Sequence, residues 1–95
     1  MTAIILPAIM DRATLNPLAT ELAECCDKGQ PLRVDGAKVS RIGLAGLQLL
    51  VCAALAAKDR DLAFEIADPS EELAGAAALS GLTTMFGLPA EGSAA

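Results

Sequence analysis

The chain has few residues of the kinds that perform catalysis. It contains no histidine, so a cysteine or serine nucleophile would lack the imidazole base that usually activates it. Its carboxylates mostly mark helix starts or solvated faces, and no two of them stand out as an acid–base pair. We therefore expect no catalytic residues, and a protein that is recognised by another protein rather than an enzyme.

Three cysteines and one glycine-containing turn are the remaining chemical candidates. Cys25 and Cys26 are adjacent in a predicted helix, where neighbouring side chains point about 100° apart and do not bridge easily. With Cys52 the cysteine count is odd, and a zinc site without histidine would need an unusual ligand set. We expect reduced thiols that pack as small hydrophobic groups in the cytosol, and no metal.

The turn at residues 43–46, Gly-Leu-Ala-Gly, precedes a predicted helix, as a phosphate-binding loop does. It lacks the following Lys-Ser/Thr and the full glycine spacing of such loops. We expect no nucleotide chemistry and no cofactor.

Composition and charge limit the possible partners. Ninety-five residues form one domain, which buries roughly 60–65% of the surface of its unfolded chain. Phe64 and Phe86 are its only aromatic residues, so aliphatic side chains must fill the core. Seven basic residues, spread along the chain, against twelve acidic ones give a net charge of −5. Nucleic acid and anionic lipid are therefore unlikely partners, whereas a basic groove on another protein is compatible.

Neither the first residues nor the longest apolar stretch predicts a targeting or membrane segment. The first residues lack a basic region, and their short apolar run stops at Pro7. The longest uncharged stretch, residues 42–57, contains Gln48 and is too short to span a bilayer. We expect a cytoplasmic protein without direct membrane insertion, with one domain over residues 1–88 and a flexible C-terminal tail over residues 89–95.

A short β-branched run stopped by Pro7 predicts a strand at residues 3–6, and alternating apolar residues predict strands at 32–35 and 62–66. Between and after them, three helices are predicted. Asn16-Pro17 is a strong helix start and Gly29 a helix end, with an apolar stripe of Leu18, Leu22 and Cys25. The order β-α-β-α-β-α predicts an α/β fold with a small, mainly parallel or mixed sheet.

The second helix begins at about Leu44 and the third at Asp68. Asp68, Pro69 and Glu71 suit the cap, first and third positions of a capping box, and Gly81 closes that helix. A further short turn is expected at residues 82–86. The second helix has one apolar stripe formed by Leu47, Leu50, Val51, Ala54 and Leu55. Its opposite face is barely polar and consists of Ala45, Leu49, Ala53 and Ala56.

Residues 34–50, VDGAKVSRIGLAGLQLL, resemble the signature of STAS domains, the sulfate-transporter and anti-sigma-factor-antagonist domains. That signature is a strand, a hydrophobic turn, and Asp-Ser-Ser-Gly-Leu at a helix start. Residues 8–11 look like the Gly-Glu-Leu-Asp after the family's first strand, and residues 80–82 look like its Ser-Gly-Leu after the third helix. The resemblance covers nearly the whole chain and implies a STAS-like four-stranded sheet flanked by helices.

In relatives that antagonise anti-sigma factors, a partner kinase phosphorylates a serine of the Asp-Ser-Ser-Gly turn. The resemblance places that acceptor on Ala45, the preceding serine on Leu44 and the aspartate on Gly43. Because a methyl group cannot accept a phosphoryl group, the usual switch cannot operate here. Ser40 is nearby, but we expect it to lie before the helix start and not to replace the acceptor.

The resemblance also implies that this region docks on the partner. We expect the contact to include Asp11, Ser40, Arg41, Gly43, Leu44, Ala45 and Gly46. The alternative is that Leu44 packs on the core and the turn is only a connector. The weakly polar second face of the following helix favours docking, since a helix with two apolar faces needs two neighbours or leaves an exposed patch.

The leading hypothesis is a non-enzymatic interaction module of bacterial signalling, either anti-sigma-factor-antagonist-like or associated with chemotaxis. Its partner would be an anti-sigma factor or a component of a kinase pathway, and the chain itself would be a monomer or weak dimer. The alternative is an accessory subunit of a phospholipid transporter ATPase, and a small-molecule or nucleotide-binding domain is a third reading.

Overall fold

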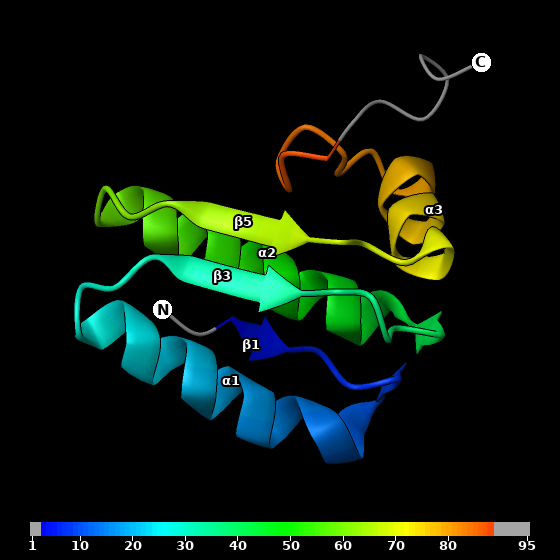
Figure 1. Ribbon diagram of the computed structural model, residues 1–95, viewed down its shortest axis with the longest axis horizontal. Coiled ribbons are helices and arrows are strands. Elements are labelled where there is room, and N and C mark those ends of the chain that lie inside the picture. The colour runs from blue at the N-terminus through cyan, green and yellow to red at the C-terminus, as the bar shows by residue number, and fades with distance from the viewer. Residues whose placement is uncertain (1–2, 89–95) are drawn as a thin grey trace.

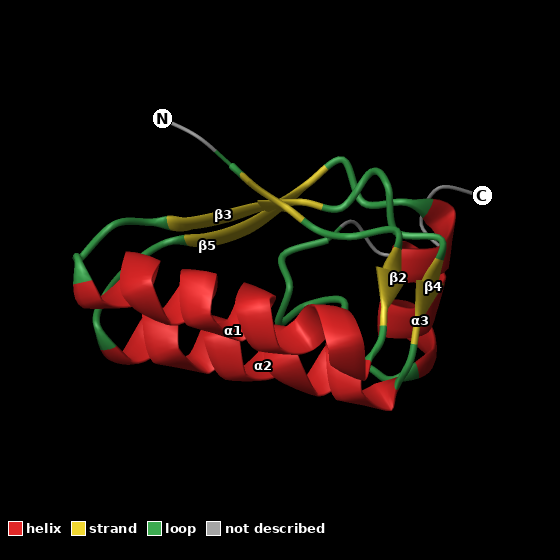
Figure 2. Ribbon diagram, turned by 90° about the horizontal axis from the view of Figure 1, so that it is seen from below, coloured by secondary structure: helices red, strands yellow, loops and turns green. Residues whose placement is uncertain are grey.

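Three parallel strands form the larger sheet of the computed structural model, which describes residues 3–88. Strands β1 (Ile4–Ile5), β3 (Leu32–Asp35) and β5 (Phe64–Ala67) pair in the order β1-β3-β5. Helices α1 (Arg12–Asp27) and α2 (Leu44–Asp59) lie side by side against one face of this sheet (Figures 1 and 2). The predicted α/β fold with parallel strands flanked by helices is confirmed.

Alternate strand residues point toward the two helices and build the core. Leu32, Val34 and Ile66 are buried on this side. Arg33 and Glu65 point to the opposite face, where they form a cross-strand ion pair of 3.1 Å between Nε and Oε1. Within residues 3–88 every buried core side chain is apolar, so the hydrophobic effect dominates the packing of the helices on the sheet.

A second, two-stranded parallel sheet lies at one end of the molecule. Strands β2 (Ile9–Met10) and β4 (Arg41–Ile42) pair there beside helix α3 (Glu71–Leu79), as Figure 2 shows. The described residues therefore form five short strands in two sheets instead of the expected single four-stranded sheet. The chain bends out of the larger sheet after β1 and again after β3, and the two departing segments pair with each other.

Helix α1 begins earlier than the sequence predicts. It starts at Arg12 rather than at Asn16-Pro17, because Asp11 and Thr14 form a capping box that closes the first turn. Pro17 is the sixth residue of the helix and exposed, where it cannot donate to the carbonyl of Ala13. The capping box at Asp11 therefore overrides the usual preference of proline for the first helical position.

The predicted helix ends agree with the structure. Gly29 follows α1 with a φ of +71°, and Gly81 follows α3 with a φ of +73°. At each end two backbone N–H groups donate back into the last turn: those of Gly29 and Gln30 after α1, and those of Gly81 and Leu82 after α3. Glycine suits both positions because it adopts this left-handed conformation without steric cost.

Helix α3 starts two residues later than predicted. Ser70, and not Asp68, caps it by accepting a hydrogen bond of 3.1 Å from the N–H of Leu73. Asp68 has a φ of +48°, so it belongs to the preceding turn. The N–H of Ser70 donates to the carbonyl of Gly36 at 3.0 Å, and this tertiary contact places the helix start.

Two predicted apolar stripes need correction. In α1 the buried face contains Cys26 instead of Cys25, which is half-buried. In α2, Leu47, Leu50 and Ala54 are buried as expected, but Val51 is half-buried and Leu55 is exposed. Cys52 lies exposed on α2, and the structure records all three cysteines as free thiols.

The expected turn after α3 is present and closes the core. The N–H groups of Phe86, Gly87 and Leu88 donate to carbonyls three to five residues earlier. Phe86 is buried, and its ring centroid lies 6.3 Å from that of Phe64. The predicted tail, residues 89–95, lies outside the described residues.

Candidate functional site

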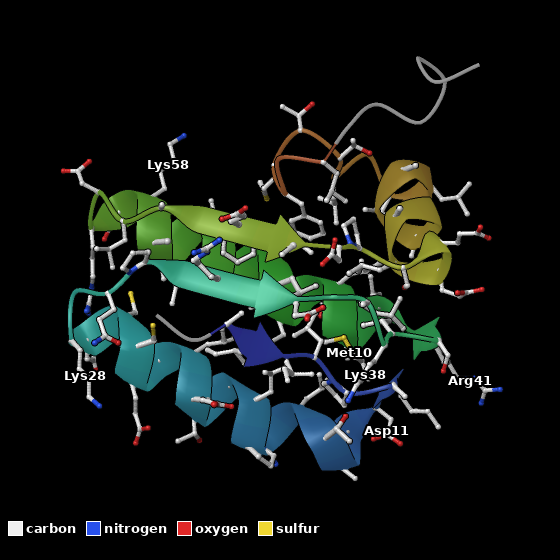
Figure 3. The ribbon with its side chains drawn as sticks, in the orientation of Figure 1. Met10, Asp11, Lys28, Lys38, Arg41 and Lys58 are labelled. Carbon is white, nitrogen blue, oxygen red and sulfur yellow. The ribbon has the colours of Figure 1, made fainter. Side chains whose placement is uncertain are left out.

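The residues predicted to bind a partner gather at one end of the molecule. This is the end to which the carboxyl ends of β1, β3 and β5 point, and where α1 and α2 begin (Figure 1). Figure 3 shows Asp11 and Arg41 at this end, with Lys28 and Lys58 at the opposite end of the same two helices. The sheet therefore brings residues 11 and 40–46 into one region although they are far apart in the sequence.

The β2–β4 pair sets the two helix starts next to each other. Met10 pairs with Ile42 in parallel register, and each is the last residue of its strand. Asp11, the residue after β2, is the cap of α1. Gly43, the residue after β4, is the cap of α2. Parallel pairing thus makes these two caps neighbours.

Asp11 has a structural role at this end. Its carboxylate Oδ1 accepts from the N–H of Thr14 at 3.2 Å, and its own N–H donates to Thr14 Oγ1 at 3.1 Å. The Thr14 hydroxyl also donates to the carbonyl of Ile9 at 2.9 Å, which ties the cap to β2. Asp11 is nevertheless exposed, and its other carboxylate oxygen makes no hydrogen bond to a residue in 3–88.

Ser40 and Arg41 anchor the start of the turn through the backbone. Both N–H groups donate to the carbonyl of Ala8, at 2.8 and 3.1 Å, and the Ser40 hydroxyl donates to the same oxygen at 3.1 Å. Both residues are exposed, and the guanidinium of Arg41 makes no hydrogen bond or ion pair to any residue in 3–88. Ser40 precedes β4 and the helix start, as predicted.

The start of α2 has no polar side chain. Gly43 is its cap, with extended backbone angles and no side-chain hydrogen bond to the first turn. Leu44 is 69% exposed and Ala45 is also exposed. The alternative that Leu44 packs on the core is therefore wrong. This first turn presents backbone N–H groups and apolar side chains, and no hydroxyl.

Gly46 is a close-packing glycine. A Cβ at this position would lie 2.9 Å from Ile42 Cγ1 and 3.3 Å from Met10 Cβ. Gly46 lies directly against Met10 of β2 and Ile42 of β4. Because glycine has no side chain, α2 can begin in contact with the β2–β4 pair. This contact fixes where Leu44 and Ala45 emerge.

The family model described as "Mlab, STAS domain" matches residues 2–88, nearly the whole chain. The chain belongs to the STAS domain family. No curated protein matches the chain. STAS domains are generally binding modules rather than enzymes, and the fold described above agrees with that family's α/β architecture. We call residues 40–46 of this STAS domain the α2 turn.

One argument for docking on this STAS domain is weakened by the structure. The weakly polar face of α2 is not left without a neighbour, because α1 packs against it. Ala53 is buried there and Leu49 is half-buried. A small apolar groove of about 190 Å³ remains between the helices, lined by Ala19, Leu22, Ala23, Cys26, Leu32, Leu49, Cys52, Ala53 and Ala56.

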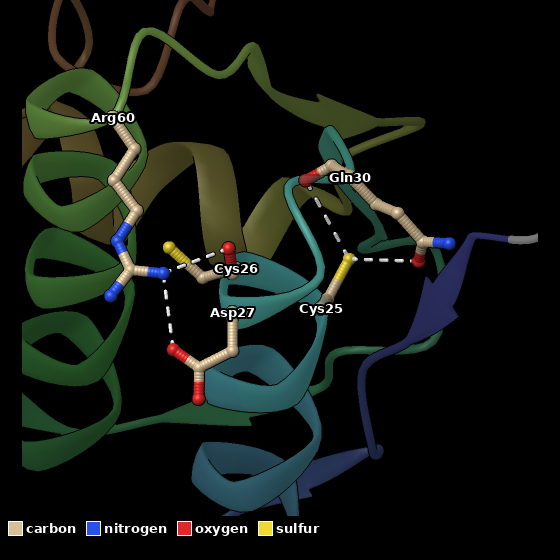
Figure 4. Close-up of polar contacts among 5 residues, drawn as sticks. All are labelled: Cys25, Cys26, Asp27, Gln30 and Arg60. Atoms are coloured by element: carbon tan, nitrogen blue, oxygen red, sulfur yellow. Dashed lines mark hydrogen bonds and ion pairs between the residues drawn. The ribbon is translucent and has the colours of Figure 1, made fainter.

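The opposite end of the same helices is closed by polar contacts. Arg60 Nη1 donates at 3.0 Å both to the carbonyl of Cys26 and to Asp27 Oδ1 (Figure 4). One guanidinium thus joins the last turn of α1 to the residue that follows α2. The Cys25 thiol lies 3.4 Å from the carbonyl of Pro31 and makes longer contacts to Gln30, which leaves it no role at the α2 turn.

A neighbouring surface was not predicted from the sequence. A groove open to solvent runs between α3 and β4, beside the α2 turn, and shares residues 40–42 with it. It is lined by Ser40, Arg41, Ile42, Glu71, Glu72, Gly75, Ala76 and Leu79. The signal present in the sequence was Gly75 inside an otherwise Ala-rich helix, a residue that helices disfavour.

Within residues 3–88, no group of three or more His, Cys, Asp or Glu side chains is placed to hold a metal ion. Among the helices in that part of the chain, none is both long enough and apolar enough to span a bilayer.

Proposed function

We propose that this STAS domain is a non-enzymatic protein-interaction module of bacterial signalling, which docks on its partner through the α2 turn in the cytoplasm. The observation that carries the proposal is Leu44, a large apolar side chain that is 69% exposed at a helix start. Exposed apolar side chains at a rigid position are suited to contact another protein. The partner is an anti-sigma factor or a component of a kinase pathway, including one of chemotaxis.

The proposed recognition is not switched by phosphorylation at the usual position. Gly43, Leu44 and Ala45 replace the Asp-Ser-Ser of the family pattern and offer no hydroxyl. Ser40 has a hydroxyl, but it donates to the carbonyl of Ala8 and lies before β4 rather than on α2. Binding is therefore constitutive, or is controlled by the abundance of either protein.

The test begins with the partner. The tagged chain is used to capture proteins from its own cells, and the captured protein is then purified and its affinity measured. Leu44→Asp should weaken binding about tenfold or more, because a charge replaces a buried apolar contact. Far-UV circular dichroism should stay near wild type, since aspartate is favourable in the first turn of a helix.

Leu55→Asp is the matched control for this test. Leu55 is a leucine of the same helix that is also exposed, at 50%, but it lies in the distal half of α2, away from the α2 turn. It should leave the affinity within about twofold of wild type. Equal losses for the two variants, or none for Leu44→Asp and Ala45→Asp, would place the contact elsewhere and contradict the proposal.

Mass spectrometry tests the absence of the phosphorylation switch. The chain purified from its own cells should have an intact mass free of phosphate, before and after phosphatase treatment. Phosphate located on Ser40 by fragmentation would show that the switch has moved rather than been lost.

A second candidate function uses the same surface. An accessory subunit of a phospholipid transporter ATPase would use the exposed Leu44 of the α2 turn for a lasting contact with the ATPase. The missing hydroxyl in the turn counts against this candidate, because the family resemblance implies that STAS proteins with this role tend to keep one. The identity of the captured protein separates the two: a transporter ATPase supports the second candidate, and an anti-sigma factor or kinase-pathway protein supports the first. Neighbouring genes provide an independent check.

A further inference from the structure

The groove between α3 and β4, which we call the α3–β4 groove, has a volume of about 410 Å³. Ile42, Gly75 and Ala76 contribute small or apolar lining to it. Arg41 lies on its β4 side, and Glu71 and Glu72 lie on its α3 side. The groove is contiguous with the α2 turn through residues 40–42, so a partner docked on that turn can extend into it.

Gly75 has no packing role against any residue in 3–88. It is the fifth residue of a nine-residue helix, a position where glycine is much less favourable than alanine. A Cβ at Gly75 would meet no atom within 4 Å, whereas a Cβ at Gly46 would clash with Ile42. The glycine at 75 is therefore not needed for packing or for an unusual φ. What its missing side chain does provide is space in the α3–β4 groove.

Leu79 gives the groove an exposed apolar edge. It is the last residue of α3 and is 93% exposed, the highest value among the large exposed hydrophobic residues in 3–88. Ala76, one turn earlier on the same face, is half-buried and lines the groove with it. An exposed leucine beside a glycine-made space fits an apolar side chain of a partner.

The charged side chains of the groove indicate which residues of a partner would lie beside that apolar side chain. Glu71 and Glu72 are exposed, and neither forms an ion pair with a residue in 3–88. Residues 89–95 contain no lysine or arginine, so that segment offers no side-chain cation either. Among residues 3–88, Arg41 is the only basic side chain that lines the groove, and it lies on the opposite wall. The α3 wall is thus acidic, and a cation of a partner is attracted to that wall rather than to β4.

We propose that the α3–β4 groove binds a protein segment in which an apolar side chain is flanked by lysine or arginine. The apolar side chain fills the space above Gly75 and contacts Leu79, and the cation pairs with Glu71 or Glu72. This proposal rests on the proposed function, because it names the chemistry of the partner that docks on the adjoining α2 turn. The acidic wall and the net charge of −5 favour a basic protein segment over an anionic membrane surface.

The test uses two synthetic amphipathic helical peptides with identical leucine positions, one with arginine and one with glutamate at the flanking positions. Each is titrated into the ¹⁵N-labelled full chain at moderate salt. The arginine peptide should shift the amide signals of Gly75, Ala76 and Leu79, and the glutamate peptide should leave them unchanged. Signal changes centred on α1, or equal binding of both peptides, would overturn the proposal.

Substitutions then show which residues of the groove contribute to the affinity for the arginine peptide. Gly75→Leu fills the space and should weaken the arginine peptide about tenfold, while the melting temperature stays equal or rises because leucine favours helix. The double variant Glu71→Lys with Glu72→Lys should weaken it about tenfold or more. Glu21→Lys with Glu24→Lys, two exposed glutamates of α1, is the matched control and should change the affinity less than about twofold.

The outcomes separate this inference from the proposed function. If Leu44→Asp weakens the cellular partner but Gly75→Leu and the Glu71/Glu72 variant do not, the α2 turn docks and the groove inference fails. If both sets of variants leave that partner bound, the proposed function fails as well. Concentration-dependent shifts of Leu79 in the free chain would assign the groove to a second copy of the chain and would also overturn the inference.

Discussion

Helices α1 and α2 begin side by side on the β2–β4 pair, but their starts are built differently. At α1, Asp11 and Thr14 exchange hydrogen bonds between side chain and backbone, and Thr14 donates to β2 as well. At α2, Gly43 offers no side chain, and the first turn exposes Leu44 and Ala45. One start is capped by side chains of its own residues, whereas the other has no side-chain cap and exposes an apolar side chain to solvent.

The two helix starts differ in their contribution to stability and in their suitability for binding a partner. A capping box typically contributes about 1 kcal/mol to a helix start, and α1 has one. The start of α2 lacks this contribution and depends on tertiary packing through Gly46. The backbone at that start is held by this packing, while the side chains of Leu44 and Ala45 stay exposed and are available for a partner. Substitutions at the two starts should accordingly have effects of different size and kind.

The largest effect on stability is expected from Gly46→Val. A valine would place carbon atoms inside the contact with Ile42 and Met10, and overpacking of this kind costs about 1–3 kcal/mol. The free energy of unfolding from urea titrations measures this loss.

Gly75→Val is the control for that prediction. It is also a helix-interior glycine, but nothing lies within 4 Å of its Cβ position. It should be neutral or slightly stabilising, by a few tenths of a kcal/mol, since valine has a higher helix propensity than glycine. Equal losses at the two glycines would mean that the loss at Gly46 does not come from its contact with the β2–β4 pair, and would contradict this prediction.

A smaller loss is expected from Asp11→Ala, which removes the cap of α1. The N–H of Thr14 would lose its acceptor, at a cost of about 1 kcal/mol. For a domain of this size that corresponds to a drop of roughly 4–8 °C in melting temperature.

The comparison variant is Asp59→Ala, at an exposed aspartate that ends α2. Its melting temperature should be unchanged or slightly raised, because a negative charge is unfavourable at a helix C-terminus. If Asp11→Ala also leaves the melting temperature unchanged, Asp11 is not the cap in solution, and its exposed carboxylate would instead serve a partner.

Local signals in the sequence were sufficient for several elements. Alternation of apolar residues gave β3 at residues 32–35, and glycine gave the ends of α1 and α3 at Gly29 and Gly81. These features depend on neighbours within a few residues, so they can be predicted from the sequence alone. The helix start at about Leu44 was predicted from the apolar stripe that follows it and agrees with the structure. The docking role of the α2 turn followed from the family resemblance and stays a prediction.

Other features depend on contacts between distant segments. Asn16-Pro17 and Asp68 are good local helix starts, yet the capping box at Asp11 and the contact of Ser70 with Gly36 decide where α1 and α3 begin. Strands β2 and β4 have two residues each, too few for alternation to be recognised. The α3–β4 groove joins residues about thirty positions apart.

The smallest effect on stability is expected from Gly43→Asp, and it is a gain, whereas Gly46→Val and Asp11→Ala cause losses. The substitution gives α2 the kind of side-chain cap that α1 already has. Gly43 has a φ of −101° and a ψ of −172°, which any residue adopts, and a Cβ there meets no atom within 4 Å. An aspartate carboxylate would accept from the first turn of α2, so stability should rise by about 0.5 kcal/mol.

That gain corresponds to roughly 2–4 °C in melting temperature, measured by calorimetry beside wild type and Gly43→Ala. Gly43→Ala has no side-chain acceptor and should show no such rise, because alanine is a poor helix cap. If Gly43→Asp gains nothing, the N–H groups of α2 are already satisfied in solution, and the contrast between the two helix starts disappears. If it gains stability but weakens the captured partner, those N–H groups belong to the docking surface together with Leu44.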